Sequence, residues 1–227
     1  MDLSTPSWRG GVHPAWANSR PEVRAVVPAR ATRVLDVGCS TGLLGAALRT
    51  EGHVVTGIEV DPSLAREADA QLDKVIEGDV EVMADEGRDP GGPFDCIVLA
   101  DVLEHLRNPW AVVRWAEGLL ASDGTIVVSI PNIRHAETFW SLLVRRRWPY
   151  KEVGIFDRTH LRFFARRNLP ELFSGTSLEI VTMNRQYMLR PGYEGGLNRL
   201  ARFLGDLGTM QFIVTAQRVS RSGVPRM

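Results

Sequence analysis

The feature that most constrains the fold is an apolar segment that ends in a glycine turn and is followed by a helix and a second apolar segment. Residues 34–42 read VLDVGCSTG, and residues 57–61 read GIEVD. A continuous apolar run is typical of a buried parallel strand, and glycines in the turn after it leave room for a ligand beside the backbone. Glu59 lies 23 residues beyond Asp36, about where a second strand carries an acid that hydrogen-bonds ribose hydroxyls. The segment therefore predicts a parallel α/β sheet with a site for an adenosine-type ligand.

The composition of the turn indicates which adenosine ligand it would hold. A dinucleotide pyrophosphate is bound by glycines spaced G-x-G-x-x-G, whereas Ser40 stands at the middle position here. Asp36 precedes the first glycine, and a carboxylate there repels a pyrophosphate but attracts a cationic ligand. The pattern D-x-G-x-S-x-G resembles motif I of the class I S-adenosylmethionine-dependent methyltransferases, whose cofactor carries a sulfonium and an ammonium. This resemblance implies cofactor contacts at Asp36, Gly38, Cys39, Ser40 and Gly42.

Two more strand ends extend the resemblance over roughly residues 18–220. Residues 75–79, VIEGD, end in an acid that binds the adenine amino group in the resembled family. Residues 94–106, FDCIVLADVLEHL, run from an apolar strand into a loop with carboxylates and a histidine, as the family's motif after strand four does. The resemblance implies a cofactor contact from Glu59 to the ribose. It implies further contacts at the ends of these strands, namely at Val60, Asp79, Val80, Ala100 and Asp101.

The order of the expected elements predicts the architecture. Strands and helices alternate over residues 33–130, which gives a parallel sheet with helices on both faces. The fold class is therefore α/β, a doubly wound, mostly parallel seven-stranded sheet with an antiparallel final strand, as in the resembled family. We expect a single domain over residues 1–227, with an amino-terminal arm and helix in residues 1–30 and an acceptor-side helical cover in residues 131–165. The remaining expected elements are a leading helix, two later helices and two final strands, at residues 18–27, 136–146, 166–173, 178–185 and 210–218.

Composition limits the class of protein. The 227 residues are enough for one α/β domain and short of two. The formal charge is zero, so the totals call for neither nucleic acid nor an acidic membrane surface. The two cysteines, Cys39 and Cys96, suit reduced thiols, no apolar run approaches a membrane span, and the amino terminus lacks a signal peptide. We expect a cytoplasmic monomer or homodimer with no nucleic-acid or membrane partner.

Two histidines are candidate catalytic bases. Methyl transfer from a sulfonium requires alignment of the acceptor and, for a hydroxyl acceptor, a group that takes its proton. His105 lies just past strand four, and His160 lies in residues 157–164, DRTHLRFF. Together with the strand-four loop, this segment resembles methyltransferases of glycan and natural-product gene contexts, and its Thr-His pair also resembles the ubiquinone-pathway O-methyltransferases. The alternative for His105 is a histidine that only packs under the cofactor. The alternative for His160 is that its segment forms a salt-bridged hinge. No metal site is expected, because no histidine or cysteine pair has ligand spacing.

Residues 134–167 carry a local excess of arginine. The run at residues 145–147, RRR, is most simply a solvated helix face. The sharper alternative is an anionic acceptor, such as a phosphorylated, nucleotide-linked or carboxylated sugar or metabolite, because arginine binds carboxylate and phosphate in bidentate geometry. The residues expected at the small-molecule acceptor are Trp16, Trp148, Asp157, Arg158 and Arg162.

These observations favour methyl transfer from S-adenosylmethionine to a hydroxyl of a sugar, glycan or natural-product intermediate. Methylation of nitrogen or carbon in a small metabolite is the nearest alternative. A nicotinamide-dependent oxidoreductase is opposed by Ser40 and by the acids at Asp36 and Asp79. A non-catalytic nucleoside-binding protein is opposed by the joint presence of the cofactor pattern and His105.

Overall fold

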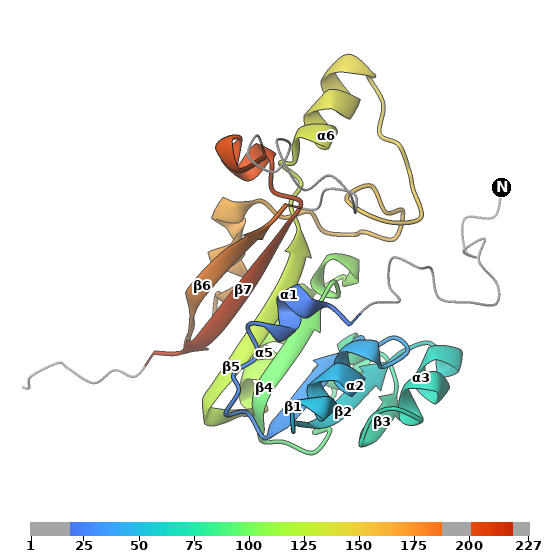
Figure 1. Cartoon of the computed structure of the whole chain (residues 1–227), viewed down its shortest axis with the longest axis vertical. Coiled ribbons are helices and arrows are strands. Elements are labelled where there is room, and N and C mark those ends of the chain that lie inside the picture. The colour runs from blue at the N-terminus through green and yellow to red at the C-terminus, as the bar shows by residue number, and fades with distance from the viewer. Residues whose placement is uncertain (1–18, 188–200, 220–227) are drawn as a thin grey trace, which may run out of the picture.

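The structure, a computed structural model, describes residues 19–187 and 201–219. Its centre is a seven-stranded sheet in the order β3-β2-β1-β4-β5-β7-β6 (Figure 1). The strand β7 runs antiparallel to its neighbours β5 and β6, and the other neighbouring strands pair in parallel. This confirms the predicted α/β class with a mostly parallel sheet and an antiparallel final strand. The strands are β1 (Arg33–Val37), β2 (Val54–Glu59), β3 (Lys74–Glu77), β4 (Phe94–Ala100), β5 (Leu120–Pro131), β6 (Leu178–Gln186) and β7 (Gln211–Arg218).

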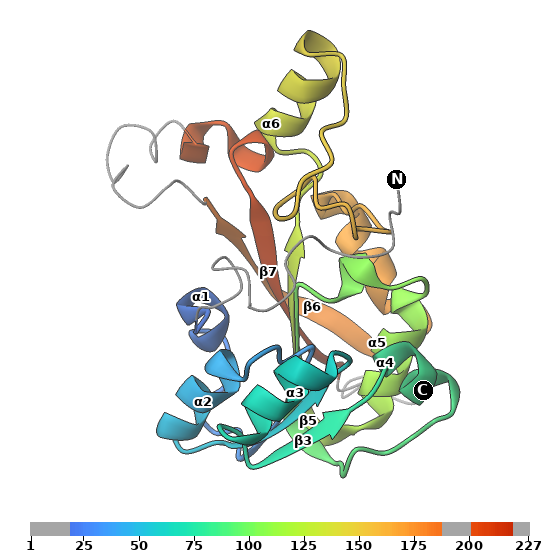
Figure 2. The ribbon, with the colours of Figure 1, turned by 90° about the vertical axis from the view of Figure 1, so that its right-hand side faces the viewer.

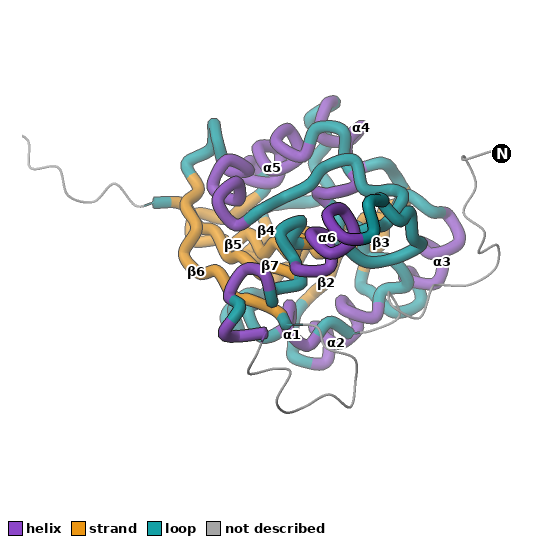
Figure 3. Tube along the Cα trace, turned by 90° about the horizontal axis from the view of Figure 1, so that it is seen from above, coloured by secondary structure: helices purple, strands orange, loops and turns teal. Residues whose placement is uncertain are grey.

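Helices cover both faces of the sheet (Figures 2 and 3). Successive residues of a strand point to opposite faces, and in β4 the buried Val98 and Leu99 accordingly belong to two different apolar clusters. Val98 packs in the cluster with α1, α2 and α3, whereas Leu99 packs in the cluster with α4, α5 and the 3₁₀ helix η3. The sheet is therefore buried on both sides, and ligand access is left at its edges. The helices are α1 (Pro21–Arg24), α2 (Leu43–Thr50), α3 (Pro62–Asp69), α4 (Val80–Asp85), α5 (Pro109–Gly118) and η3 (Arg166–Phe173).

Side-chain caps fix where the helices begin after β2 and β3. The carboxylate of Asp61 accepts hydrogen bonds from the backbone N–H groups of Ser63 and Leu64 at the start of α3. In the same way, Asp79 accepts a hydrogen bond from the backbone N–H of Glu81 at the start of α4. Such caps satisfy N–H groups that have no partner within the helix. Both carboxylates are thereby held at the carboxyl edge of the sheet.

The segment expected as an acceptor-side cover, residues 131–165, leaves the carboxyl end of β5 and returns beside it. Asn132 and Phe164 form a parallel bridge between the two ends of the segment. The buried side-chain amide of Asn132 also donates hydrogen bonds to the backbone oxygens of Asp206 and Thr209. Figure 1 shows α6, within this segment, rising beyond the carboxyl ends of the strands. The segment is thus attached firmly at its base, at the edge where ligands of open α/β sheets bind.

The helix predicted over residues 136–146 is wound differently from the expectation. Four α-helical residues, α6 (Ala136–Phe139), continue directly into a wider π-helical turn, η2 (Trp140–Val144). A π turn moves side chains away from the spacing at which an amphipathic α-helix gathers them on one face. The large apolar side chains of this stretch are accordingly exposed: Phe139, Trp140, Leu142, Leu143 and Val144.

Two other predicted helices also differ from the expectation. The leading helix expected over residues 18–27 is the single turn α1, and Pro28 follows it and disfavours helical backbone at the residue before itself. Residues 166–173 form a 3₁₀ helix, η3, that contains Pro170, which has no N–H to donate to an α-helical ladder.

Within the described ranges, none of the helices has the length and apolarity that crossing a bilayer requires.

Candidate active site

The larger of two adjoining cavities opens at the carboxyl ends of β1, β2 and β4. It has a volume of about 560 Å³, and its wall is made by the turn after β1, the end of β2 and the loops after β3 and β4. This is the edge at which open α/β sheets bind their ligands. The structure brings together here His105 and ten of the eleven residues expected at the cofactor: Asp36, Gly38, Cys39, Ser40, Glu59, Val60, Asp79, Val80, Ala100 and Asp101.

Gly42, the eleventh residue, shapes the turn and does not line the cavity. It has a φ of 85° and precedes α2, and a Cβ there would lie 3.1 Å from Cα of Ala68 in α3. Gly38 has a φ of 69°, and a Cβ there would lie 2.7 Å from Cγ2 of Val102. Both positions combine left-handed backbone with a close neighbour, which glycine alone tolerates without strain. The two glycines therefore allow the tight turn and the close packing around it.

Glu59 is held in place at the end of β2 by the backbone. The N–H of Ser40 donates to Oε2 at 2.8 Å, and the N–H of Asp61 donates to Oε1 at 2.9 Å. The side chain is buried at 7% exposure, so its rotamer is fixed by these two hydrogen bonds and by packing. Each carboxylate oxygen can accept more than one hydrogen bond. Glu59 thus presents two oriented acceptors to the cavity, as a ribose diol requires.

Asp36 is a buried carboxyl group with an unused oxygen. It is 2% exposed, and its Oδ2 has no hydrogen-bond partner among the described residues. Burial, followed by the negative charge of Glu59, raises the pKa of Asp36 to about 7, although the charge of Arg20 opposes the shift. A buried charge is costly unless it is paired. A positive ligand group in the cavity would stabilise the ionised form of Asp36.

A second cavity, of about 280 Å³, adjoins the first. The two cavities share Arg20, Asp101 and His105 in their walls. The far side of the second cavity is formed by residues 153–155 of the cover and by residues of β5 and β7. The three shared residues therefore lie where a molecule in the second cavity would meet one bound in the first.

Asp101 is fixed at this junction by a polar network. Its backbone has a φ of 57°, a strained conformation for a residue other than glycine. Arg20 donates to its Oδ2, and the side chains of Ser129 and Gln211 donate to its Oδ1 at 3.1 and 2.8 Å. Arg20 also donates to Glu22 at 2.6 Å. Residues from three separate parts of the chain thus hold the Asp101 carboxylate in one orientation.

A hydrogen-bond chain determines the tautomer of His105, which lies on the 3₁₀ turn η1 (Leu103–His105). The hydroxyl of Thr159 donates to Oδ1 of Asp157 at 2.7 Å, and Nδ1 of His105 lies 2.9 Å from the same hydroxyl oxygen. Because the carboxylate takes the hydroxyl proton, Nδ1 of His105 donates its N–H to the oxygen, and Nε2 is left with a lone pair. Burial lowers the pKa of His105 more than the charge of Asp157 raises it. His105 is therefore a neutral imidazole that can accept a proton.

His160 and Glu104 lie beside His105. The rings of His105 and His160 meet edge to face with centroids 4.8 Å apart. Burial, followed by the repulsion that two protonated rings would exert on each other, lowers the pKa of His160. Ligand atoms of Glu104, His105 and His160 all lie within 4.8 Å of one another, and a carboxylate with two imidazoles is a donor set that divalent zinc accepts. The expectation that no metal site exists used linear spacing, which misses a set that the fold assembles from two distant segments.

Three residues expected at the acceptor lie outside both cavities. Trp148 packs edge to face on Phe156 and Phe163, with centroids 4.8 and 5.5 Å apart. The guanidinium of Arg158 pairs with a carboxylate within the cover, at Glu152. Arg162 donates to the backbone oxygen of Arg107, and its guanidinium lies 5.9 Å from the ring centroid of Trp110. These side chains stabilise the cover, whereas Asp157 does line the second cavity. Trp16 lies outside the described residues.

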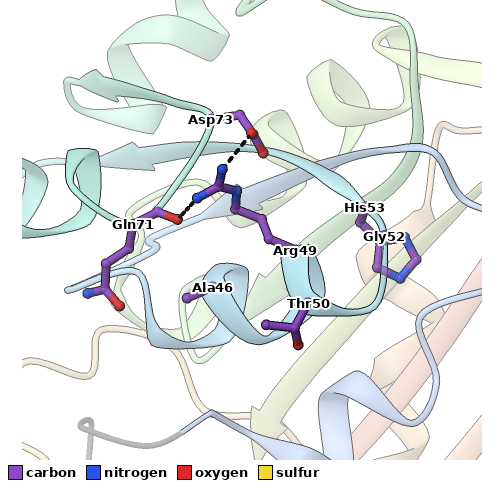
Figure 4. A pocket seen from close by; sticks show the side chains of 7 residues that line it. All are labelled: Ala46, Arg49, Thr50, Gly52, His53, Gln71 and Asp73. Carbon is purple, nitrogen blue, oxygen red and sulfur yellow. Dashed lines mark hydrogen bonds and ion pairs between the residues drawn. The ribbon is translucent and has the colours of Figure 1, made fainter.

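A third hollow, of about 490 Å³, lies at the opposite edge of the sheet (Figure 4). It is bounded by the end of α2 and by His53 and Asp73, which precede β2 and β3. Arg49 crosses it and is bound by the Asp73 carboxylate at 3.0 Å and by the backbone oxygen of Gln71. The amino ends of the strands are not where ligands of this fold bind, and the cationic group in this hollow is already paired.

Sequence reasoning missed several polar residues of the two cavities, among them Glu104, Thr159, Arg20 and Gln211. Glu104 and Thr159 precede the two candidate histidines in the sequence, so the same motifs contain them. The sequence did not show which residues they contact. Arg20 and Gln211 carry no signal in the sequence. They reach Asp101 from positions 81 and 110 residues away in the chain, Arg20 through the packing of α1 on the sheet and Gln211 through the order of the strands.

Comparison with known proteins agrees with this geometry. A family model described as a methyltransferase domain matches residues 8–183. Ubiquinone biosynthesis O-methyltransferases of Xylella fastidiosa and Xanthomonas campestris are 38% and 35% identical to the chain over 113 residues, which cover 47% and 48% of this chain. The alignments cover 44% and 47% of those proteins, so the chain spans less than half the length of the curated relatives it matches.

Solved structures share the fold. A putative S-adenosylmethionine-dependent methyltransferase from Listeria monocytogenes has a TM-score of 0.65 and 13% identity, covering 91% of this chain and 99% of that one. Magnesium protoporphyrin IX methyltransferase from Synechocystis PCC 6803, with bound SAH, has a TM-score of 0.63 and 14% identity, covering 93% and 90%. The family match extends over more than half of the sequence. The chain therefore belongs to the methyltransferase domain family.

Proposed function

We propose that the chain transfers the methyl group of S-adenosylmethionine to a hydroxyl of a small-molecule acceptor, with His105 as the general base. The observation that carries this proposal is the chain of hydrogen bonds from Asp157 through Thr159 to His105, at the junction of the two cavities. It leaves an imidazole nitrogen available where the contents of the cavities would meet. A base with these properties is required for a hydroxyl acceptor and not for an acceptor that is already nucleophilic.

The reaction that we propose is an in-line displacement. The acceptor oxygen attacks the methyl carbon, the carbon–sulfur bond breaks, and its electron pair remains on the sulfur of S-adenosylhomocysteine. The hydroxyl proton passes to Nε2 of His105, and the imidazolium is stabilised through Thr159 by the Asp157 carboxylate. His160 is the second candidate for this role, since its ring lies against that of His105 and its pKa is also lowered by burial.

The larger cavity is the proposed cofactor site. Glu59 would hold the ribose hydroxyls, and Asp79 would accept a hydrogen bond from the adenine amino group. Asp36 would lie near a positive group of the cofactor, where its unpartnered oxygen gains a partner. The remaining residues of the predicted cofactor set line the same cavity, except Gly42, which allows the tight turn and its close packing against α3.

The second cavity is the proposed acceptor site, with the cover as its outer wall. A sugar, glycan or natural-product hydroxyl remains the acceptor class that we propose. The resemblance to O-methyltransferases supports oxygen as the methylated atom, and nitrogen or carbon methylation is the alternative. The positions of Arg158 and Arg162 no longer support a preference for an anionic acceptor. A cytoplasmic location and a monomeric or homodimeric state belong to the same proposal and rest on composition.

The test is to incubate the protein with S-adenosylmethionine that carries a trideuterated methyl group and with a panel of small hydroxyl, amine and carbon acceptors. Mass spectrometry identifies the labelled product and the atom that carries the label. We expect labelled methyl ethers, and label only on nitrogen or carbon would contradict the proposal. A parallel reaction after dialysis against EDTA should proceed at the same rate. Activity that is lost on chelation and restored by zinc would assign Glu104, His105 and His160 to a metal and overturn the role of His105 as base.

A further inference from the structure

The charges of the second cavity indicate what kind of acceptor it takes. Four carboxyl side chains and one guanidinium line it. The guanidinium of Arg20 is already bound by two of those carboxylates, Glu22 and Asp101. Both histidines in the wall have their pKa lowered by burial, so they add no positive charge near neutral pH. The wall therefore carries an excess of acidic groups over basic ones.

One of these acidic groups is buried without a partner. Glu104 is 1% exposed, it lines the cavity, and neither of its carboxyl oxygens has a hydrogen-bond partner among the described residues. Nε2 of His160 lies 4.0 Å from Oε1, beyond hydrogen-bond distance. Buried carboxyl groups are ordinarily hydrogen-bonded, and an exception at a cavity indicates a group that a ligand completes.

The backbone keeps Glu104 in this position. Its carbonyl oxygen accepts hydrogen bonds from the N–H groups of Leu161 and Arg162 at 2.8 and 3.0 Å, which join η1 to the returning end of the cover. Burial, followed by the charge of Asp101, raises the pKa of Glu104 well above its ordinary value. A positive ligand group would reverse this shift by pairing with the ionised form.

We propose that the acceptor carries a protonated amine in addition to the hydroxyl that is methylated, and that the Glu104 carboxylate binds this ammonium group. The inference rests on the proposed transfer to a hydroxyl in the second cavity and names the class of acceptor, an amino sugar or another small amino alcohol. An ammonium supplies the hydrogen-bond donors and the positive charge that the cavity lacks. A carboxylate or phosphate in the same place would be repelled by Asp101, Asp157 and Glu104.

The test compares acceptors that differ in one group. One set is glucosamine, glucose and glucuronate, and the other is dopamine, ethylcatechol and dihydroxyphenylacetate. Calorimetry with protein saturated with S-adenosylhomocysteine measures binding of each, and methyl transfer is measured separately. In at least one set we expect the amine to bind at least tenfold more tightly than the neutral member, with the carboxylate weakest. Equal or tighter binding of the carboxylate, or no binding of either amine at millimolar concentration, would overturn the inference.

The variant Glu104→Gln keeps the size of the side chain and removes its charge. We expect it to lower the ratio of amine to neutral affinity at least tenfold, whereas Glu86→Gln, an exposed control outside both cavities, leaves the ratio unchanged. An unchanged ratio in folded Glu104→Gln would contradict the inference. If this variant does not fold, the comparison of acceptors on the wild-type protein decides the inference. Selective amine binding without methyl transfer to a hydroxyl would instead contradict the proposed function and leave the charge preference intact.

Discussion

The hydroxyl oxygen of Thr159 lies 2.9 Å from Nδ1 of His105, although 54 residues separate the two in the chain. This contact makes Thr159 a positioning residue, because it fixes the ring and the tautomer of His105 without reaching the acceptor. Thr159→Val should lower kcat about tenfold or more, with little change in the affinity for S-adenosylhomocysteine. Thr159→Ser, which restores the hydroxyl, should recover most of the rate. Thr50→Val removes an exposed hydroxyl on α2 and is the matched control. Equal rates in Thr159→Val and Thr50→Val would contradict the role of Thr159.

The pH dependence of the reaction follows from the lowered pKa of His105. A general base acts in its neutral form, so kcat/KM should fall as the pH drops through the pKa of His105 in the free enzyme. Burial places that pKa below the ordinary value of 6.5, so the rate should stay level down to a lower pH than an exposed histidine would allow. A pH profile measured with a saturating cofactor checks this. An inflection above 6.5 that persists in the His105→Gln variant would assign the titration to another group.

Removal of the Glu59 carboxylate should weaken cofactor binding. A lost pair of charge-assisted hydrogen bonds costs about 1.5 to 3 kcal/mol, which corresponds to roughly a 10- to 150-fold rise in Kd. Calorimetry with S-adenosylhomocysteine on Glu59→Ala measures the change. Glu77→Ala at the end of the neighbouring strand β3 is the control, because Glu77 does not line the cavity. Equal Kd values for the two variants would remove Glu59 from the ribose site.

Asp36 should make the protein less stable as the pH rises. Its pKa in the folded state, about 7, lies above the ordinary value of 3.8, so the unfolded chain releases this proton at a lower pH than the folded protein does. The contribution of Asp36 to stability is therefore fully present below about pH 3.8 and is lost as the pH rises through 7. Between pH 5 and pH 8, the free energy of unfolding of the wild type should fall by about 2 to 3 kcal/mol more than that of Asp36→Asn. Parallel urea titrations of both proteins measure this difference. An identical pH dependence in the two proteins would show that ionising Asp36 does not destabilise the folded state.

The arginines of the cover should contribute little to acceptor recognition. Arg158 pairs with Glu152 at partial exposure, and exposed pairs of this kind are worth at most about 1 kcal/mol. Arg158→Ala and the surface control Arg146→Ala should therefore change the acceptor KM by similar, small factors. A selective tenfold rise in KM for Arg158→Ala would restore the arginine cover as an anion-binding wall.

The sequence predicted those parts of the site whose residues lie close together in the chain, and it did not predict contacts between distant segments. The glycine turn, Asp36 and Glu59 lie within one strand-helix-strand unit, so local spacing was enough to predict the cavity wall that they form. Gln211 approaches Asp101 because β4, β5 and β7 are neighbours in the sheet, and Arg20 approaches it because α1 packs on that sheet. Spacing along the sequence encodes neither arrangement. Aromatic and basic residues of the cover suggested a pocket wall, yet Trp148 packs on two phenylalanines instead. A composition typical of pockets is also typical of a compact loop that carries its own small core.

The central claim is that His105 accepts the acceptor proton, and a single-turnover measurement tests it most directly. With enzyme in excess over S-adenosylmethionine and a hydroxyl acceptor saturating, rapid quenching records the methyl-transfer step itself. His105→Gln should slow this step by about 10²- to 10⁴-fold while the Kd for S-adenosylhomocysteine stays within about twofold of the wild-type value. A methyl-transfer rate near that of the wild type in this variant, with the cofactor bound, would contradict the account.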